Sequence, residues 1–69
     1  MEWNRVHGKS IEEAEQILTQ YGWKITNIKN RPKHNLILIT YKKESILPKE
    51  MEIEFDNNVA SGCIERKLW

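Results

Sequence analysis

Apolar and polar residues between positions 10 and 21 follow the period of an α-helix. The apolar positions at this spacing are Ile11, Ala14, Ile17, Leu18 and Tyr21, which share one helix face. Ser10 stands where a helix needs an N-cap, and Glu13 follows at the spacing of a capping box. Gly22 is the residue type that ends helices in a left-handed conformation. The pattern predicts one amphipathic helix over residues 10–21.

Beyond position 22 the period changes to that of β-strands. Strands are predicted at residues 23–28, 36–41, 50–56 and 59–64. The segment 50–56 alternates without interruption, as in a strand with one exposed face, whereas 36–41 is apolar on both faces, as is typical of an inner strand. The polar connection at 42–49 is predicted to be a loop. Asn57-Asn58 predicts a tight hairpin, and Gly62 predicts a bulge in the last strand.

These elements predict an α+β fold, with one amphipathic helix packed on a three- to four-stranded, mainly antiparallel sheet. The expected core consists of Ile11, Ala14, Ile17, Leu18, Ile25, Leu36, Leu38, Met51, Ile53 and Phe55. The strand at 36–41 has a second apolar face, made of Ile37, Ile39 and Tyr41 or of the alternate set, which nothing else in the chain covers. We therefore expect self-association or a protein partner at that face.

Length and composition are those of a single small domain spanning residues 1–69. The chain is 39% hydrophobic and 30% charged, and 11 basic against 10 acidic residues leave a formal charge of +1. This balance does not indicate nucleic-acid or membrane binding from charge alone. The longest apolar run is too short to span a membrane, and no secretory leader pattern is visible. With Cys63 as the single cysteine, no internal disulfide forms, and we expect a cytoplasmic location and no membrane contact.

Residue types that carry catalysis or hold cofactors are sparse. Cys63, His7 and His34 lie far apart in the sequence and outside any recognised motif, so we interpret Cys63 as a structural core residue. Metal ligands at close spacing and a glycine-rich phosphate loop are both missing from the sequence. The acidic residues of 50–56 are interpreted as a solvated strand face. We expect a protein that is not an enzyme and that needs no cofactor.

A basic segment at residues 29–43 contains no acidic residue. Its cations are Lys29, Arg31, Lys33, His34, Lys42 and Lys43. If the flanking strands pair, these cations gather near one end of the sheet, and Tyr41 adjoins them as a stacking residue does in single-strand binders. Basic residues also keep sheet edges soluble, which is the alternative interpretation. Nucleic-acid binding through Lys29, Arg31, Lys33 and Tyr41 is therefore the second functional hypothesis.

Two stretches resemble the potato type I (eglin-like) serine protease inhibitors. Glu2-Trp3 followed by Gly8-Lys9-Ser10-Ile11-Glu12-Glu13-Ala14 is similar to the opening of that family, and Ile53-Glu54-Phe55-Asp56-Asn57-Asn58-Val59-Ala60 is similar to its strand, turn and closing strand. The resemblance implies an exposed protein-binding loop in the segment 42–49. The leading hypothesis is thus a small protein-binding module, with the partner contacting Lys42, Lys43, Glu44, Ser45, Ile46 and Leu47.

A second resemblance uses part of the same sequence. Gly8-Lys9-Ser10-Ile11-Glu12-Glu13-Ala14 together with Gly22-Trp23-Lys24-Ile25 also looks like the start of PASTA domains. These are modules of one helix and three strands, and the resemblance implies binding of cell-wall fragments. Both resemblances share the well-capped helix that ends at a glycine.

Overall fold

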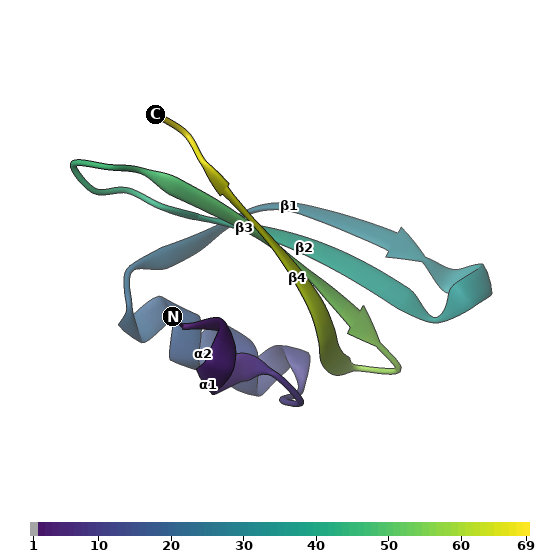
Figure 1. The fold of residues 1–69 in the computed structure, drawn as a ribbon. Coiled ribbons are helices and arrows are strands. Elements are labelled where there is room, and N and C mark those ends of the chain that lie inside the picture. Colours follow the sequence, from purple (N-terminus) through teal and green to yellow (C-terminus); the bar gives the residue numbers. More distant parts are fainter. Residues whose placement is uncertain (1) are drawn as a thin grey trace.

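The computed structural model describes residues 2–69 and consists of two helices on one face of a four-stranded antiparallel sheet (Figure 1). The elements are α1 (Trp3–Val6), α2 (Ile11–Gln20), β1 (Trp23–Arg31), the 3-10 turn η1 (Pro32–His34), β2 (Leu36–Lys43), β3 (Lys49–Asp56) and β4 (Val59–Lys67). The strand order is β1-β2-β3-β4, so each strand pairs with its neighbour in the sequence. The predicted α+β fold class is confirmed. The sheet face that carries the helices is called the helix side below, and the opposite one the open face.

The helix α2 forms where the capping pattern predicts it. The backbone N–H of Glu13 donates to Ser10 Oγ at 3.2 Å, and the Glu13 carboxylate accepts from the Ser10 backbone N–H at 3.5 Å. These two bonds satisfy amide groups that the first helical turn leaves free. Tyr21 is the C-cap, and Gly22 follows with a φ of 88°, a conformation that glycine adopts without strain. The predicted helix is therefore confirmed, with its first and last predicted residues serving as caps.

The short helix α1 was not predicted, because four residues are too few to show a period. Val6 is fully buried and anchors this helix in the core. The segment that follows is tied to β4, since the Gly8 N–H donates to the Ala60 carbonyl and the Ala60 N–H donates to the Lys9 carbonyl, both at 2.9 Å. The chain before α2 is thereby fixed to the edge of the sheet.

Local signals also set the hairpin and the bulge at the end of the chain. Asn57 and Asn58 have φ values of 51° and 65°, the left-handed pair that a two-residue hairpin requires. The β3–β4 register shifts between Glu54, which pairs with Gly62, and Phe55, which pairs with Ala60, so the predicted bulge is present. A second irregularity lies in β1, between Ile25 and Asn27.

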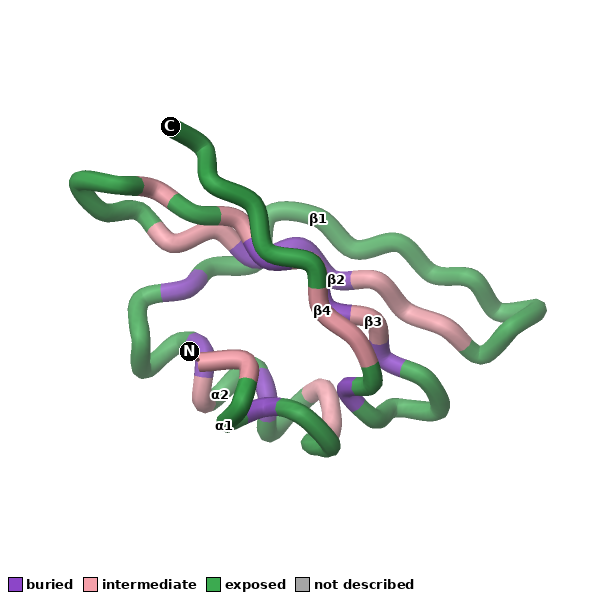
Figure 2. Tube along the Cα trace, viewed as in Figure 1, coloured by how far each residue is buried: buried purple, intermediate pink, exposed green. Residues whose placement is uncertain are grey.

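The core lies between the helices and the middle of the sheet, where Figure 2 shows the buried segments together. Its buried members are Val6, Ala14, Leu18, Trp23, Ile39, Tyr41, Met51, Ile53, Phe55 and Ala60. Trp3, Ile11, Ile17, Ile37 and Cys63 pack against them and are partly buried. Most of the expected core is thus present. Within the described residues, no helix is long and apolar enough to cross a membrane.

The expected orientation of β2 is wrong. Leu36 and Leu38 were placed in the core, but they lie on the open face, because they pair with Asp56 and Glu54 of β3. The alternate residues, among them Ile39 and Tyr41, point to the helix side. Alternation within β2 could not decide between two apolar faces, and the register with β3 decides it. Ile25, also expected in the core, remains 38% exposed on the edge strand β1.

Candidate functional site

The loop between β2 and β3 presents apolar side chains to solvent. Ile46 is 98% exposed and Leu47 is 50% exposed. The Ser45 hydroxyl donates to the Leu47 carbonyl at 2.9 Å, which shapes the tip of the loop. The Leu68 N–H donates to the Pro48 carbonyl at 3.1 Å, so the last residues of the chain lie beside the loop. The loop therefore holds two apolar side chains at the surface on a backbone that is supported at two points.

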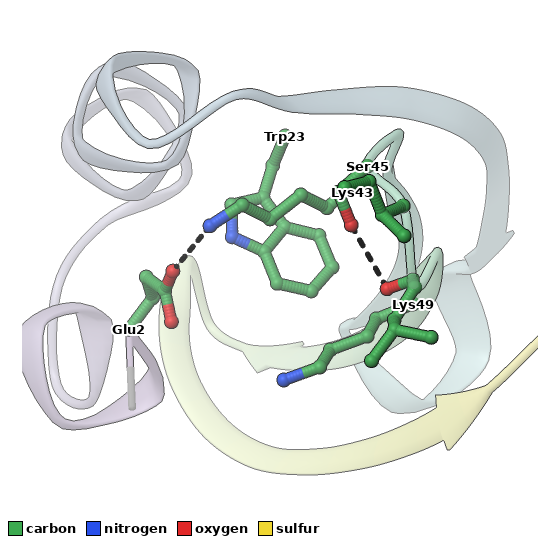
Figure 3. A pocket seen from close by; sticks show the side chains of 7 residues that line it. Glu2, Trp23, Lys43, Ser45 and Lys49 are labelled. Atoms are coloured by element: carbon green, nitrogen blue, oxygen red, sulfur yellow. Dashed lines mark hydrogen bonds and ion pairs between the residues drawn. The ribbon is translucent and has the colours of Figure 1, made fainter.

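Next to this loop lies a pocket, here called the Trp23 pocket, with a volume of about 470 Å³ (Figure 3). It is lined by Glu2, Trp23, Lys43, Ser45, Ile46, Leu47 and Lys49. The Trp23 side chain is 4% exposed, and its indole Nε1 has no hydrogen-bond partner within residues 2–69. A buried indole N–H without an acceptor is unusual, because burying a donor unpaired costs free energy. The pocket thus combines an apolar wall with an indole N–H that has no well-formed hydrogen bond but lies near enough to the Glu2 carboxylate to help lower the pKa of Glu2.

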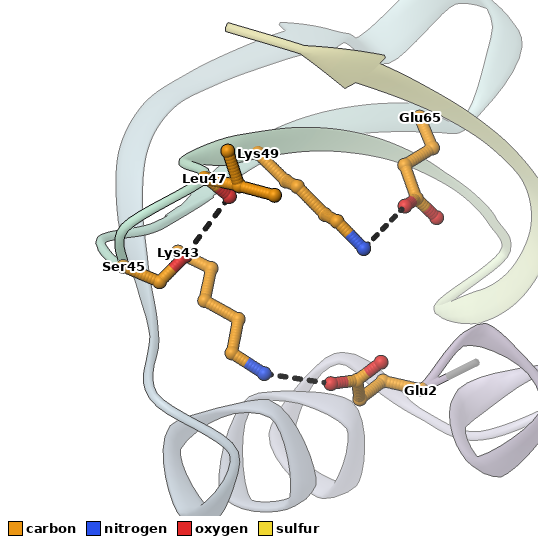
Figure 4. A network of polar contacts seen from close by, with 6 residues as sticks. All are labelled: Glu2, Lys43, Ser45, Leu47, Lys49 and Glu65. Carbon is orange, nitrogen blue, oxygen red and sulfur yellow. Dashed lines mark hydrogen bonds and ion pairs between the residues drawn. The ribbon is translucent and has the colours of Figure 1, made fainter. Parts of the chain in front are cut away.

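Charged side chains border the Trp23 pocket. Lys43 Nζ lies 3.0 Å from a Glu2 carboxylate oxygen and 5.9 Å from the centroid of the Trp23 ring. The hydrogen bond from Lys43 lowers the pKa of Glu2 below its usual value, although partial burial acts in the opposite direction. Lys49 Nζ is 3.9 Å from a Glu65 carboxylate oxygen (Figure 4). Two lysines line the pocket, each beside a glutamate, so an acidic or carbonyl-bearing ligand group would bind a lysine there by replacing one of these contacts.

The structure brings four of the six predicted protein-binding residues together. Lys43, Ser45, Ile46 and Leu47 all line the pocket. Glu44 is exposed in the loop outside this lining. Lys42 belongs to the open face instead, where it pairs with β1 and β3 neighbours in the sheet, because successive strand residues point to opposite faces. The loop is also shorter than predicted, since β2 continues to Lys43 and β3 begins at Lys49.

Sequence reasoning missed three members of the pocket: Glu2, Trp23 and Lys49, the last of which ends the predicted loop but was not among the predicted contacts. Trp23 reaches the loop because it pairs with Lys43 across β1 and β2. Glu2 reaches it because α1 folds back onto the helix side of the sheet (Figure 1). A tryptophan directly after the helix-ending Gly22 was the available signal, but it did not reveal which part of the chain would lie opposite. These contacts depend on the strand register.

The predicted nucleic-acid residues do not form one surface. Lys29, Arg31 and Lys33 are exposed towards the turn between β1 and β2. Lys42 and Lys43 lie at the other end of the same pair of strands, so the expectation that all of these cations gather at one end is wrong. The expected stacking residue Tyr41 is 1% exposed on the helix side, and its ring is not accessible to a base.

Cys63 lies against the core and is partly buried. Burial, with a smaller contribution from the charge of Glu65, raises the pKa of the thiol to about 11. The thiol is therefore protonated at neutral pH, and a protonated thiol is a poor nucleophile. Within residues 2–69, no group of three or more His, Cys, Asp and Glu side chains is arranged to hold a metal ion.

Comparisons of the chain with protein-family models, with curated proteins and with solved structures find no match.

Proposed function

We propose that this chain is a small protein-binding module that holds a segment of a partner between the loop at residues 44–48 and the Trp23 pocket. The observation that carries the proposal is the position of Ile46, which is 98% exposed beside a pocket walled by a buried tryptophan. An apolar side chain that makes no contact of its own contributes nothing to folding, whereas it gains free energy when a partner covers it. Aromatic residues in pockets are common centres of binding energy.

The arrangement suggests how the partner is held. An apolar side chain of the partner packs against Trp23, while Ile46 and Leu47 insert into the partner surface. Covering Ile46 contributes about 1.5–3 kcal/mol, and covering Leu47, which is already half buried, contributes about half as much. A carboxylate or carbonyl oxygen of the partner takes the place of the Glu2 carboxylate and accepts from Lys43 or from the Trp23 N–H. The expected partner segment therefore carries an apolar residue next to an acidic one.

Inhibition of a serine protease is the special case that the potato type I resemblance suggests. In that family the following strand braces the loop with arginines, and the corresponding positions here hold Glu50 and Glu52. Those two carboxylates face Arg66 of β4 on the open face, at 2.7 Å and 3.9 Å. The Ser45–Leu47 and Leu68–Pro48 hydrogen bonds support the loop in their place. Incubation with subtilisin-like and chymotrypsin-like proteases tests this case, and cleavage within the loop without inhibition excludes it.

The general proposal is tested by selecting ligands from a displayed library of random peptides. Peptides that bind the wild-type protein should contain an apolar residue beside an acidic one. The Ile46→Asp variant should bind them about 100-fold more weakly, since it loses the apolar contact and adds a like charge. The matched control is Val59→Asp, because Val59 is also an exposed apolar residue, 43% exposed in β4, but is not part of the pocket.

Two outcomes would contradict the proposal. One is a selection that yields no peptide above background on the wild-type protein. The other is a set of peptides whose affinity is unchanged by Ile46→Asp, or reduced equally by Val59→Asp. Fluorescence of Trp23 in a variant with Trp3→Phe and Trp69→Phe provides an independent signal, since a peptide in the pocket changes the surroundings of that indole.

A further inference from the structure

The open face of the sheet carries its charges in two separate columns. Residues that pair across antiparallel strands point to the same face, so the register fixes which side chains share the open face. The β1 column is Lys24, Asn27, Lys29 and Arg31. The β3 column is Glu50, Glu52, Glu54 and Asp56. Between them lie Leu36, Leu38, Thr40 and Lys42 of β2. A basic column and an acidic column therefore flank a central strand with two leucines.

These charges are mostly not neutralised within one chain. The two columns are separated by two strand spacings, roughly 9–10 Å, and the side chains of β2 lie between them. Within residues 2–69, Lys29, Arg31, Glu54 and Asp56 form no ion pair. Arg66 neutralises only part of the acidic column, through Glu50 and Glu52. No helix lies over this face (Figure 1). At the end of the sheet where Arg31 and Asp56 lie, the two columns thus carry unpaired charges of opposite sign.

We propose that the open face binds the open face of a second copy of this chain. The arrangement follows from a twofold axis that runs parallel to β2 and above it. Rotation about this axis exchanges the positions of β1 and β3 and leaves the position along the strands unchanged. Lys29 of each copy then faces Glu54 of the other, and Arg31 faces Asp56. A twofold axis across the strands places like columns over each other, and repulsion disfavours it.

The central strand of the proposed interface is apolar at the end where Leu36 and Leu38 lie and polar at the other end, where Lys42 faces its counterpart. Leu36 and Leu38 lie near the axis, so each faces its own counterpart in the second copy. Packed sheets are separated by about 10 Å, which the leucine side chains fill and which lysine and glutamate side chains bridge. From the strand spacing and rise, β1 to β3 offer roughly 400 Å² per copy. This is below the area of a standard stable interface, so we expect a weak dimer that is strengthened by charge complementarity.

This surface is separate from the proposed loop and pocket, and charge reversal tests it independently. Lys29→Glu with Arg31→Glu makes both columns acidic at this end, and Glu54→Lys with Asp56→Lys makes both basic. Each variant alone should dimerise at least tenfold more weakly than the wild type. An equimolar mixture should form a one-to-one heterodimer, because each β1 column then faces a column of opposite sign. A chain with all four exchanges should again dimerise with itself.

Net charge alone is controlled by a second pair of substitutions. The control is Lys9→Glu/Lys33→Glu. Like Lys29→Glu/Arg31→Glu, it replaces two cations with glutamates, which lowers the formal charge by 4, from +1 to −3. The control keeps the β1 column intact, so it should dimerise like the wild type. When the control is mixed with the Glu54→Lys/Asp56→Lys variant, the two proteins differ in net charge as much as in the mixture of Lys29→Glu/Arg31→Glu with Glu54→Lys/Asp56→Lys, called the complementary mixture. The control mixture should nevertheless associate more weakly than the complementary mixture.

Sedimentation equilibrium up to about 500 μM, at low and at high salt, measures the association. Circular dichroism checks that every variant is folded. The proposal is supported by a wild-type dimer that weakens with salt and by rescue only in the complementary mixture. It is overturned if the folded wild type stays monomeric at low salt, or if both mixtures associate equally. A monomer that binds a single-stranded oligonucleotide through Lys29 and Arg31 would also overturn it.

Discussion

Replacing Tyr41 by phenylalanine should raise the free energy of unfolding. The Tyr41 side chain is 1% exposed on the helix side of β2, and within residues 2–69 its hydroxyl has no hydrogen-bond partner. In the unfolded chain the same hydroxyl is hydrated. Folding therefore loses those bonds to water and replaces them with none. Phenylalanine keeps the ring and its packing and removes only the unpaired oxygen.

The size of the gain follows from the cost of leaving a hydroxyl unpaired. Burying an unpaired hydroxyl costs about 1–3 kcal/mol, which the substitution removes. Removing the oxygen also leaves a small void in the core, and the void offsets part of this gain. We expect a net stabilisation of about 1–2 kcal/mol. For a domain of this size, each kcal/mol raises the melting temperature by about 4–8 °C. A shift of this size is measurable in a single thermal unfolding experiment.

Alkaline pH provides a second, independent measurement on the same residue. Burial, assisted by the charge of Glu15, raises the pKa of Tyr41 from 10.0 to about 12. Since the folded protein holds this proton more tightly than the unfolded chain, its contribution to stability is complete below pH 10 and is lost as the pH rises through 12. Two pKa units correspond to at most about 2.7 kcal/mol. The Tyr41→Phe variant should lack this alkaline loss.

Urea unfolding followed by circular dichroism gives both quantities, and Tyr21→Phe is the matched control. Tyr21 is 37% exposed, so removal of its hydroxyl should change the free energy of unfolding little. Tyr41→Phe should be more stable than the wild type at neutral pH, and the difference should grow between pH 10 and 12. If Tyr41→Phe is destabilised by about 1 kcal/mol or more, the hydroxyl is hydrogen-bonded in solution and the reasoning is refuted.

Three further outcomes test local features of the fold. Ser10→Ala should reduce the free energy of unfolding by about 1 kcal/mol in urea titrations, because it removes the N-cap of α2, and an unchanged value would contradict the role of the capping box. Asn58→Ala should destabilise more than Asn58→Gly, since both lose the 3.2 Å bond from the Ile11 N–H but only alanine is strained at a φ of 65°. The Cys63 thiolate, followed by its ultraviolet absorbance, should appear only as the pH approaches 11, and stability from this group should decline from pH 9.0 through 11. Rapid labelling of Cys63 in the folded protein at neutral pH would contradict that expectation.

Features encoded by neighbouring residues were predictable from the sequence. Ser10 and Glu13 define the start of α2 through bonds across three residues, and Asn57-Asn58 defines a turn through its own backbone preference. The strand β3 was equally clear, because its inward residues alternate with carboxylates that require solvent. Each of these signals is complete within about ten residues of sequence. No knowledge of the rest of the fold was needed.

Features that depend on pairing between distant segments were not predictable. The residues of β2 are apolar on both sides, so alternation could not show that Ile39 points to the helices and Leu38 to the open face. The Trp23 pocket required the register of β1 with β2 and the return of Glu2 to the sheet. The residues of the two charge columns were visible in the sequence only as a basic segment and an acidic strand. Only the strand order showed that they lie on one face.

The two proposed surfaces together imply a bivalent molecule. A twofold axis parallel to β2 keeps the loops of both copies at the same end of the dimer, while the Trp23 pockets lie on the helix sides, away from the interface. Two selected peptides joined by a flexible linker should therefore bind the dimer more tightly than one peptide, by up to about 100-fold when the linker spans both pockets. The Lys29→Glu/Arg31→Glu variant should bind the single peptide normally and lose this gain. An equal gain in both proteins would show that the second peptide does not bind a second copy, and would refute this geometry even if each surface binds alone.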